Sequence, residues 1–249
     1  MLTVRNIEPG CTLDPAGGAY TLFRMARRNR VDPFGDLHAV PDHGLFTGNR
    51  GCLVNEHGEL VRHHRGLLWI TCVLEYKDWK SPLSAPRHWT PLFFLDDAVA
   101  LAAGHRPCGL CRPAAYRSYK EAVSRARNTD APLSAAELNR SLAADRLKPG
   151  RGMNRSTDRK TWAANIDRLP TGTVIVDDSN RACVVMPDEI RAFDFGGWMT
   201  PEPRPDDQPV MVLTPPTSVA ALSFGYQPLL HPSVHELVAQ TRPDRRIHT

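Results

Sequence analysis

The sequence predicts an α+β fold with an N-terminal region of strands and short helices, a helical middle and a small β-rich C-terminal part. Apolar runs rich in β-branched residues occur in both halves, amphipathic helical patterns are concentrated after Pro113, and Gly and Pro residues separate the segments. We expect residues 1–147 to form one unit and residues 166–249 a second, smaller one. A basic linker at 148–165 is expected between them.

The composition is typical of a protein with a hydrophobic core and without a membrane span. Of the 249 residues, 41% are hydrophobic, and no apolar run approaches the ~20 residues needed to cross a bilayer. The first residues lack the basic start and apolar segment of a secretion signal, so we expect a cytoplasmic protein. The net charge is only +4, but 26 of the 31 cationic residues are arginine, either because the guanidinium suits phosphate or because the genome is rich in G and C.

Strand and turn signals dominate the N-terminal part. The expected strands there are 52–54, 60–61, 67–74 and 92–95. A Gly-containing turn joins the first two as a hairpin, and the third is predicted to be a buried central strand because its residues are β-formers and nearly all apolar. A short helix is then expected to begin at Asp96 and Asp97 and to end at Gly104.

Two longer helices are predicted in the middle of the chain, and strands after them. One helix follows Pro113, and the other begins at Ser134, which has capping-box spacing to Glu137. The expected C-terminal strands are 174–176, 182–186 and 210–213, and the polar turn 177–180 joins the first two into a hairpin.

Cys108 and Cys111 are the strongest functional signal. Two cysteines with two residues between them form a chelating loop, and Gly109 eases the turn. A redox pair would follow a strand at the start of a helix, whereas this pair follows a helix stop and Pro107. We therefore predict a metal site, with Zn²⁺ as the expected ion, that staples the N-terminal region.

The surrounding segment, residues 92–113, resembles the zinc-binding domain of the Ada family of DNA-alkylation-response proteins. The matching residues are Phe94, Ala102, Ala103, Gly104, Arg106, Pro107, Cys108, Cys111, Arg112 and Pro113. In that family four cysteines hold zinc, one of them accepts a methyl group from a DNA phosphotriester, and the domain binds DNA. By this resemblance, Cys108 and Cys111 are the downstream ligand pair.

The upstream half departs from the family pattern, which places two cysteines close together. Here the candidates are Cys52 and Cys72, which adjacent strands could bring together because strands lie ~4.8 Å apart. Alternative ligands are His57, His63, His64 and His105. Cys11 and Cys183 are not expected to bind metal, and Cys52 is the better candidate for a methyl acceptor because Cys72 lies in an apolar strand.

DNA is the expected partner, and phosphate contacts are predicted from cationic residues near the metal site. These residues are Arg50, Arg106, Arg112, Arg117 and Lys120. One alternative function is a ββα-metal-like nuclease that uses His43 and His63, and another is an interaction protein with a purely structural zinc. No Gly-rich phosphate loop occurs, so no nucleotide cofactor is expected.

Overall fold

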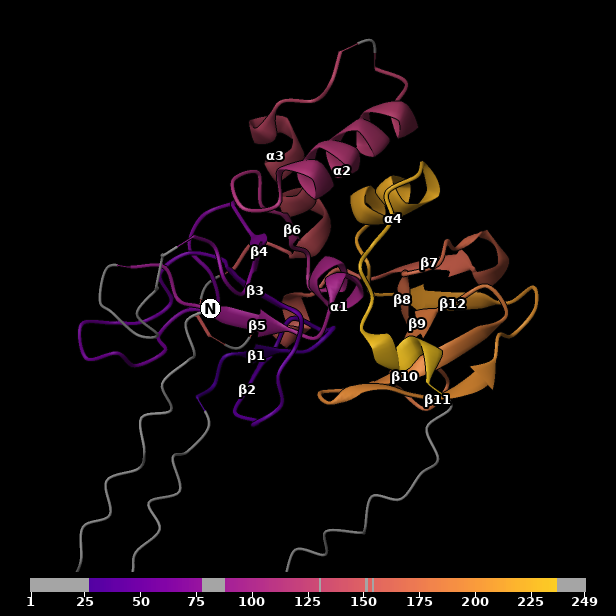
Figure 1. Cartoon of the computed structure of the whole chain (residues 1–249), viewed down its shortest axis with the longest axis horizontal. Coiled ribbons are helices and arrows are strands. Elements are labelled where there is room, and N and C mark those ends of the chain that lie inside the picture. The colour runs from indigo at the N-terminus through magenta and orange to yellow at the C-terminus, as the bar shows by residue number, and fades with distance from the viewer. Residues whose placement is uncertain (1–26, 78–87, 130, 151, 154, 237–249) are drawn as a thin grey trace, which may run out of the picture.

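The structure is a computed structural model that describes residues 27–77, 88–129, 131–150, 152–153 and 155–236. It contains two six-stranded sheets and four α-helices, which confirms the predicted α+β class (Figure 1). No helix in these described ranges is long and apolar enough to cross a membrane.

The first sheet is formed by the N-terminal part of the chain, in the order β2-β1-β5-β3-β4-β6. Its strands are β1 (Arg30–Val31), β2 (Leu37–His38), β3 (Phe46–Asn49), β4 (Ile70–Val73), β5 (Leu92–Phe94) and β6 (Arg106–Pro107). β1 runs parallel to β5, and β4 runs parallel to β6, whereas the other neighbours are antiparallel. The expected hairpin before β4 is reduced to a single bridge between Val54 and Leu60.

The buried strand predicted over 67–74 is shorter and less buried than expected. β4 covers only Ile70–Val73, and Leu67, Leu68 and Leu74 are each about half exposed. The physical reason is that the outer neighbour of β4 is the two-residue strand β6, so much of this segment lies at a sheet edge.

The first three of the four helices begin close to the residues that the sequence indicates. The helices are α1 (Asp97–Ala102), α2 (Pro113–Ala126), α3 (Ala135–Arg146) and α4 (Pro216–Ser223). Asp96 caps α1 by accepting a hydrogen bond from the Val99 amide, and Ser134 and Glu137 form the predicted capping box of α3. α2 packs against α4 through a buried cluster in which the Tyr119 hydroxyl lies 2.8 Å from the Ser218 hydroxyl.

The second sheet is formed by the C-terminal part and is antiparallel, in the order β11-β10-β9-β8-β12-β7. Its strands are β7 (Trp162–Asn165), β8 (Val174–Val176), β9 (Ala182–Val185), β10 (Glu189–Asp194), β11 (Gly197–Pro203) and β12 (Pro209–Val212). Three 3₁₀ turns accompany it, η1 (Ser156–Asp158), η2 (Ile166–Arg168) and η3 (Pro232–His235). β8 and β9 form the hairpin expected at 174–186.

The basic linker expected at 148–165 stays a prediction, and the structure describes its residues 148–150, 152–153 and 155–165. They include η1 and the edge strand β7, and the buried Arg155 side chain donates to the carbonyl oxygens of Lys148 and Gly150. A basic segment without hydrophobic periodicity is here folded by arginine-to-backbone hydrogen bonds, which leave no periodic signal in the sequence.

The two sheets share one hydrophobic cluster around α1, which lies between them (Figure 1). Phe94 and Val99 from the first part pack in it with Val184 and Trp198 from the second. The indole N–H of Trp198 also donates to the buried Asp96 carboxylate at 2.6 Å. Independent folding of 1–147 and 166–249 stays a prediction, but each part supplies side chains to the core of the other.

Candidate metal centre

The pairing of β4 with β6 brings Cys72 beside Cys108. The two strands are parallel, with Thr71 opposite Pro107, and the Cys108 amide continues the ladder by donating to the Thr71 carbonyl at 2.9 Å. Cys72 follows Thr71 and Cys108 follows Pro107, so the two thiols lie at adjacent positions of neighbouring strands. A connection of more than thirty residues is closed by this pairing.

A tight turn returns Cys111 to the same place. The Arg112 amide donates to the Cys108 carbonyl at 3.1 Å, and α2 begins at the next residue, Pro113. A side chain at Gly109 would place its Cβ 3.2 Å from the Tyr116 ring, so a glycine allows the ring to pack against the turn. A tight turn that leads directly into α2 thus holds the side chains of Cys108 and Cys111 close together.

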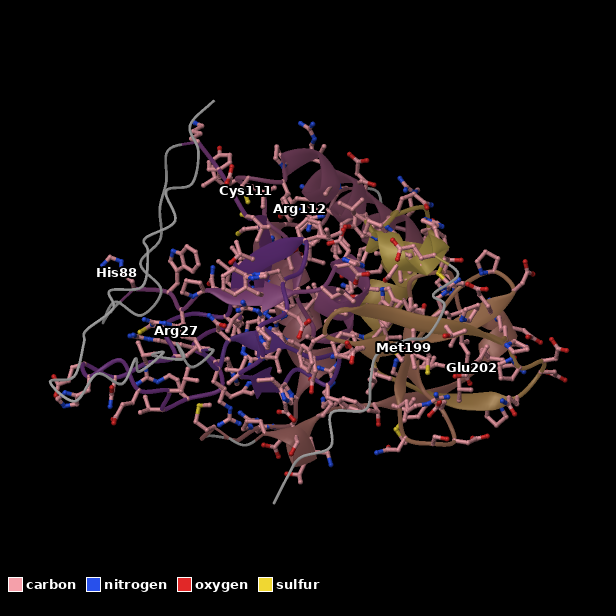
Figure 2. All side chains as sticks on the ribbon, turned by 60° about the horizontal axis from the view of Figure 1, so that its bottom comes forward. Arg27, His88, Cys111, Arg112, Met199 and Glu202 are labelled. Carbon is pink, nitrogen blue, oxygen red and sulfur yellow. The ribbon has the colours of Figure 1, made fainter. Side chains whose placement is uncertain are left out.

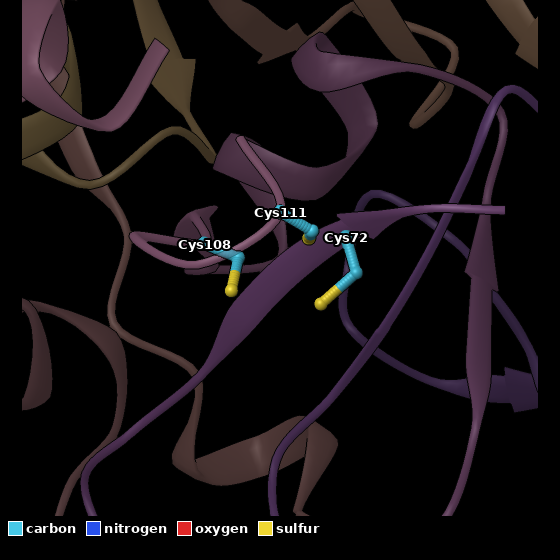
Figure 3. Close-up of side chains that lie close together, drawn as sticks. All are labelled: Cys72, Cys108 and Cys111. Carbon is cyan, nitrogen blue, oxygen red and sulfur yellow. The ribbon is translucent and has the colours of Figure 1, made fainter. Parts of the chain in front are cut away.

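The three sulphur atoms of Cys72, Cys108 and Cys111 all lie within 4.8 Å of one another (Figure 3). Tetrahedral zinc with bonds of about 2.3 Å holds its sulphur ligands about 3.8 Å apart, so small side-chain movements suffice to bind an ion here. Figure 3 shows Cys72 on its strand and the other two on the adjacent loop. The cluster could hold a metal ion, and it is the one such group of histidine, cysteine and acidic residues in the described part of the chain.

The protonation of the cluster fits a cation site. A hydrogen bond from the Cys72 thiol, together with the backbone amides of Cys111 and Leu110, lowers the pKa of Cys108 to about 5. The pKa of Cys72 is raised, since its thiol donates to Cys108 and is partly buried. Burial raises the pKa of Cys111. Without a cation the cluster therefore favours one thiolate, and a divalent ion would allow all three sulphurs to ionise.

A buried ion pair between Arg112 and Asp97 stabilises the backbone next to the cluster. Arg112 binds Asp97 through two hydrogen bonds of 2.7 and 2.8 Å, and it donates to the Thr71 hydroxyl at 2.8 Å. Asp97 also accepts hydrogen bonds from the Tyr226 hydroxyl and the Leu229 amide. This network fixes the residues next to Cys72 and Cys111 against α1 and the C-terminal segment.

Sequence reasoning missed the role of Asp97 and Thr71 in this support. Asp97 was expected only as an acidic residue in the first helical turn, and Thr71 only as part of a strand. The acidic pair Asp96 and Asp97 before an otherwise apolar helix was the available signal, because buried carboxylates need partners.

Cys52, expected as a ligand, is not part of the cluster. Its thiol is buried and donates to the Val54 carbonyl at 3.5 Å. The register explains the separation: Cys72 lies opposite Thr47, and β3 runs away from it to Asn49 before the chain reaches Cys52. An antiparallel neighbour thus carries Cys52 to the far end of β4, which the sequence alone did not reveal.

The other residues weighed as ligands also lie elsewhere. His57 is exposed, whereas His63 and His64 pack on Trp69, and His105 is fully buried between Trp69 and Phe94. Cys183 is buried in β9 of the second sheet. Cys11 lies outside the described residues.

The cationic residues expected to contact nucleic acid divide into two groups. Arg50 and Arg106 are buried, and the Arg112 side chain is 8% exposed and ion-paired, so these three are interior groups rather than surface contacts. Arg106, for example, donates to Asn139 and to the Pro107 carbonyl. Arg117 is exposed and Lys120 half-buried on α2. Figure 2 shows Cys111 and Arg112 next to each other, away from Met199 and Glu202 of the second sheet.

The chain was compared with protein-family models, curated proteins and solved structures. None of them matches it. The resemblance of residues 92–113 to the Ada zinc domain therefore stays an expectation, and the geometry of the cysteine cluster carries the functional argument.

Proposed function

We propose that this protein binds one zinc ion through Cys72, Cys108 and Cys111. The observation that carries the proposal is the convergence of three sulphur atoms from two chain segments. Soft thiolate ligands favour Zn²⁺ over Mg²⁺, Ca²⁺ or Mn²⁺, which prefer oxygen. The backbone N–H of Leu110, 3.4 Å from the Cys108 sulphur, is suited to stabilise a bound thiolate.

Three protein ligands leave one position of a tetrahedral ion available. No fourth histidine, cysteine or acidic residue within the described ranges joins the cluster. Structural zinc sites have four protein ligands, whereas sites with three bind water or an external molecule in the fourth position. The arrangement therefore supports an exchangeable or reactive zinc site more than a purely structural one.

We propose DNA as the partner of this zinc site, on the basis of α2. The helix begins two residues after Cys111, so a bound ion would fix its first turn. Arg117 and Lys120 project from it, and no carboxylate within the described ranges lies at ion-pair distance from either. Such cations are available for phosphate, and the resemblance to a DNA-binding domain points in the same direction. No observation favours the nuclease, since His43 and His63 belong to no candidate metal cluster.

Elemental analysis of the purified protein tests the zinc site. We expect about one zinc per chain in the wild type and little in Cys72→Ser, Cys108→Ser and Cys111→Ser. Cys183→Ser and Cys52→Ser are matched controls, because both thiols are buried outside the cluster, and both should retain zinc. Full zinc content in Cys108→Ser, or none in the wild type, would refute the proposal.

The affinity for a short DNA duplex, measured by fluorescence anisotropy at several salt concentrations, tests the partner. Replacing Arg117 and Lys120 by Ala should weaken binding and reduce the slope of log affinity against log salt by about one per cation. Arg168→Ala, at an exposed cation in η2, should leave both unchanged. An affinity that changes neither with salt nor with these substitutions would exclude DNA as the partner.

A second measurement distinguishes a methyl acceptor from a binding site. It is the mass of the zinc-loaded protein after exposure to methylated DNA.

A further inference from the structure

A cavity of about 620 Å³ lies in the N-terminal part of the fold, and none of its lining residues belongs to the cysteine cluster. Its lining is rich in groups that ionise or donate hydrogen bonds. The polar side chains among the lining residues are Arg28, Asp36, His38, Arg50, His63 and Ser156. Leu37, Ala39 and Met153 complete the wall, so polar side chains outnumber apolar ones around a space large enough for a small metabolite.

Arg50 is the unusual member of this wall. It is fully buried, its Nη1 donates to the Gly35 carbonyl at 2.9 Å, and its guanidinium stacks over the Trp69 ring at 5.1 Å. Its Nε and Nη2 have no hydrogen-bond partner in the described structure. A buried guanidinium without an anion is costly, and the pKa of Arg50, which burial lowers to about 9, still leaves it charged at neutral pH.

A second arginine, Arg159, lies close to Gly35, as Arg50 does. The Nη1 atoms of Arg159 and Arg50 would lie 3.7 and 3.8 Å from a Cβ on Gly35, a residue with φ of +90°. Arg159 donates to the carbonyls of Ala102 and Leu213, but its buried Nε has no described partner. Asp32 and Asp36 act on both arginines only at longer range, since neither forms an ion pair with them. Two guanidinium groups therefore lie beside Gly35, and no carboxylate among the described residues forms an ion pair with either.

The unpaired atoms of Arg50 have the geometry of an oxyanion receptor. Nε and Nη2 form one edge of the guanidinium, which donates two parallel hydrogen bonds to a phosphate or carboxylate. His63, 6% exposed, adds a nitrogen to the same wall, and Arg28 is an exposed cation on the lining. Asp36 would repel a bare anion, but it can accept a hydrogen bond from a hydroxyl group of a larger ligand.

We propose that this cavity binds a small phosphorylated molecule that carries hydroxyl groups, with the phosphate held by Arg50 and Arg28 and a hydroxyl by Asp36. The volume exceeds that of a free phosphate ion, and the excess of cations over Asp36 selects an anionic ligand. The site is independent of the cysteine cluster, so it stands whether or not zinc binds.

Isothermal titration with adenosine monophosphate, inorganic phosphate and adenosine tests this site on the full chain. We expect the monophosphate to bind and adenosine not to bind. Arg50→Lys, which keeps the charge but loses the two-donor edge, and Arg28→Ala should each weaken binding about tenfold or more. Arg140→Ala removes the same charge from an exposed position of α3 outside the cavity, and it should bind like the wild type. If Arg50→Lys does not fold, the affinity of Arg28→Ala is compared with that of the wild type and of Arg140→Ala.

The outcomes separate the sources of phosphate. Tighter binding of the monophosphate than of inorganic phosphate would support a phosphorylated metabolite, and equal affinities would replace it by free phosphate and overturn the hydroxyl contact to Asp36. Absence of binding by both anions would overturn the site itself. So would equal losses in Arg28→Ala and Arg140→Ala, because the attraction would then be a general effect of charge.

Discussion

At the scale of single residues, arginine has two distinct uses in this protein. Some arginines lie on the surface as ordinary cations, whereas others are interior groups whose guanidinium nitrogens bind backbone carbonyl oxygens. Arg146 is an example of the second use, since it donates to the carbonyls of Gly104 and Leu67 and stacks on Trp69. The planar fork of five donors makes such contacts possible, and lysine could not replace it.

The ion pair between Arg112 and Asp97 gives a prediction at this scale. We expect Arg112→Met to lower the free energy of unfolding by about 3 kcal/mol, because it leaves the buried Asp97 carboxylate without its cation. Urea denaturation monitored by circular dichroism measures this loss. The control is Arg181→Met, which removes an arginine that is about half exposed and pairs with Asp177 and Glu202, and it should cost less than about 1 kcal/mol. Equal losses would mean that the Asp97 pair is no more important than a surface contact.

The element scale shows why part of the candidate site could be predicted and part could not. Cys108 and Cys111 are close in sequence, and a turn next to a helix stop was enough to identify them as a chelating pair. The position of Cys72 depends on the parallel pairing of β4 with β6, and Cys52 lies outside the cluster. Sequence alone does not reveal either position, because sheet register is a long-range property. Helix ends were predicted well, since capping depends on a few neighbouring residues.

The end of α1 gives a prediction about one such local signal. Gly104 has φ of +83°, and a Cβ there would lie 2.5 Å from the side chain of Arg146, which two carbonyl oxygens hold in place. Gly104→Ala should therefore lower the unfolding free energy by more than the roughly 1 kcal/mol of backbone strain alone.

Gly66→Ala is the matched comparison for this substitution. Gly66 has nearly the same φ, +81°, but a Cβ there would meet no atom within 4 Å, so only the backbone strain should remain. Thermal unfolding of both variants measures the difference. If the two lose equal stability, the close approach of Arg146 to α1 has no energetic role.

At the scale of the whole molecule, the α+β class followed from local patterns, but the shared core did not. The sequence predicts separate units before and after 148–165 because their hydrophobic runs are far apart in sequence. In the structure, Trp198 of the second sheet packs at α1 and bonds to Asp96. A tryptophan and a carboxylate 102 positions apart give no periodic signal, so the sequence could not connect them.

The buried histidines predict the response of the whole fold to acid. Burial lowers the pKa of His63 to about 2, and the pKa of His105 lies well below its usual value for the same reason. Both are neutral in the folded protein and take up protons when it unfolds below about pH 6.5. Stability is therefore fully present above this pH and should fall by about 0.8 kcal/mol per histidine between pH 7.5 and pH 6.

Urea titrations in phosphate-free buffer measure this dependence. The range ends at pH 6 because Asp96, whose pKa burial raises to about 6, acts in the opposite sense below that value. His105→Phe should flatten the slope, whereas His57→Ala at an exposed site should leave it unchanged. A slope that is the same in all three proteins would show that His105 is not buried in its neutral form.

The contacts of the C-terminal segment with α1 determine when the N-terminal part can finish folding during translation. Asp96 and Asp97, at the start of α1, accept hydrogen bonds from the backbone amides of His231 and Leu229, and Val234 packs in the cluster around α1. During synthesis on the ribosome, the first sheet emerges long before these partners do. Until then the two acids have only their partners in the N-terminal part, Val99 and Arg112. The N-terminal part therefore reaches its final form only after nearly all of the described chain has been translated.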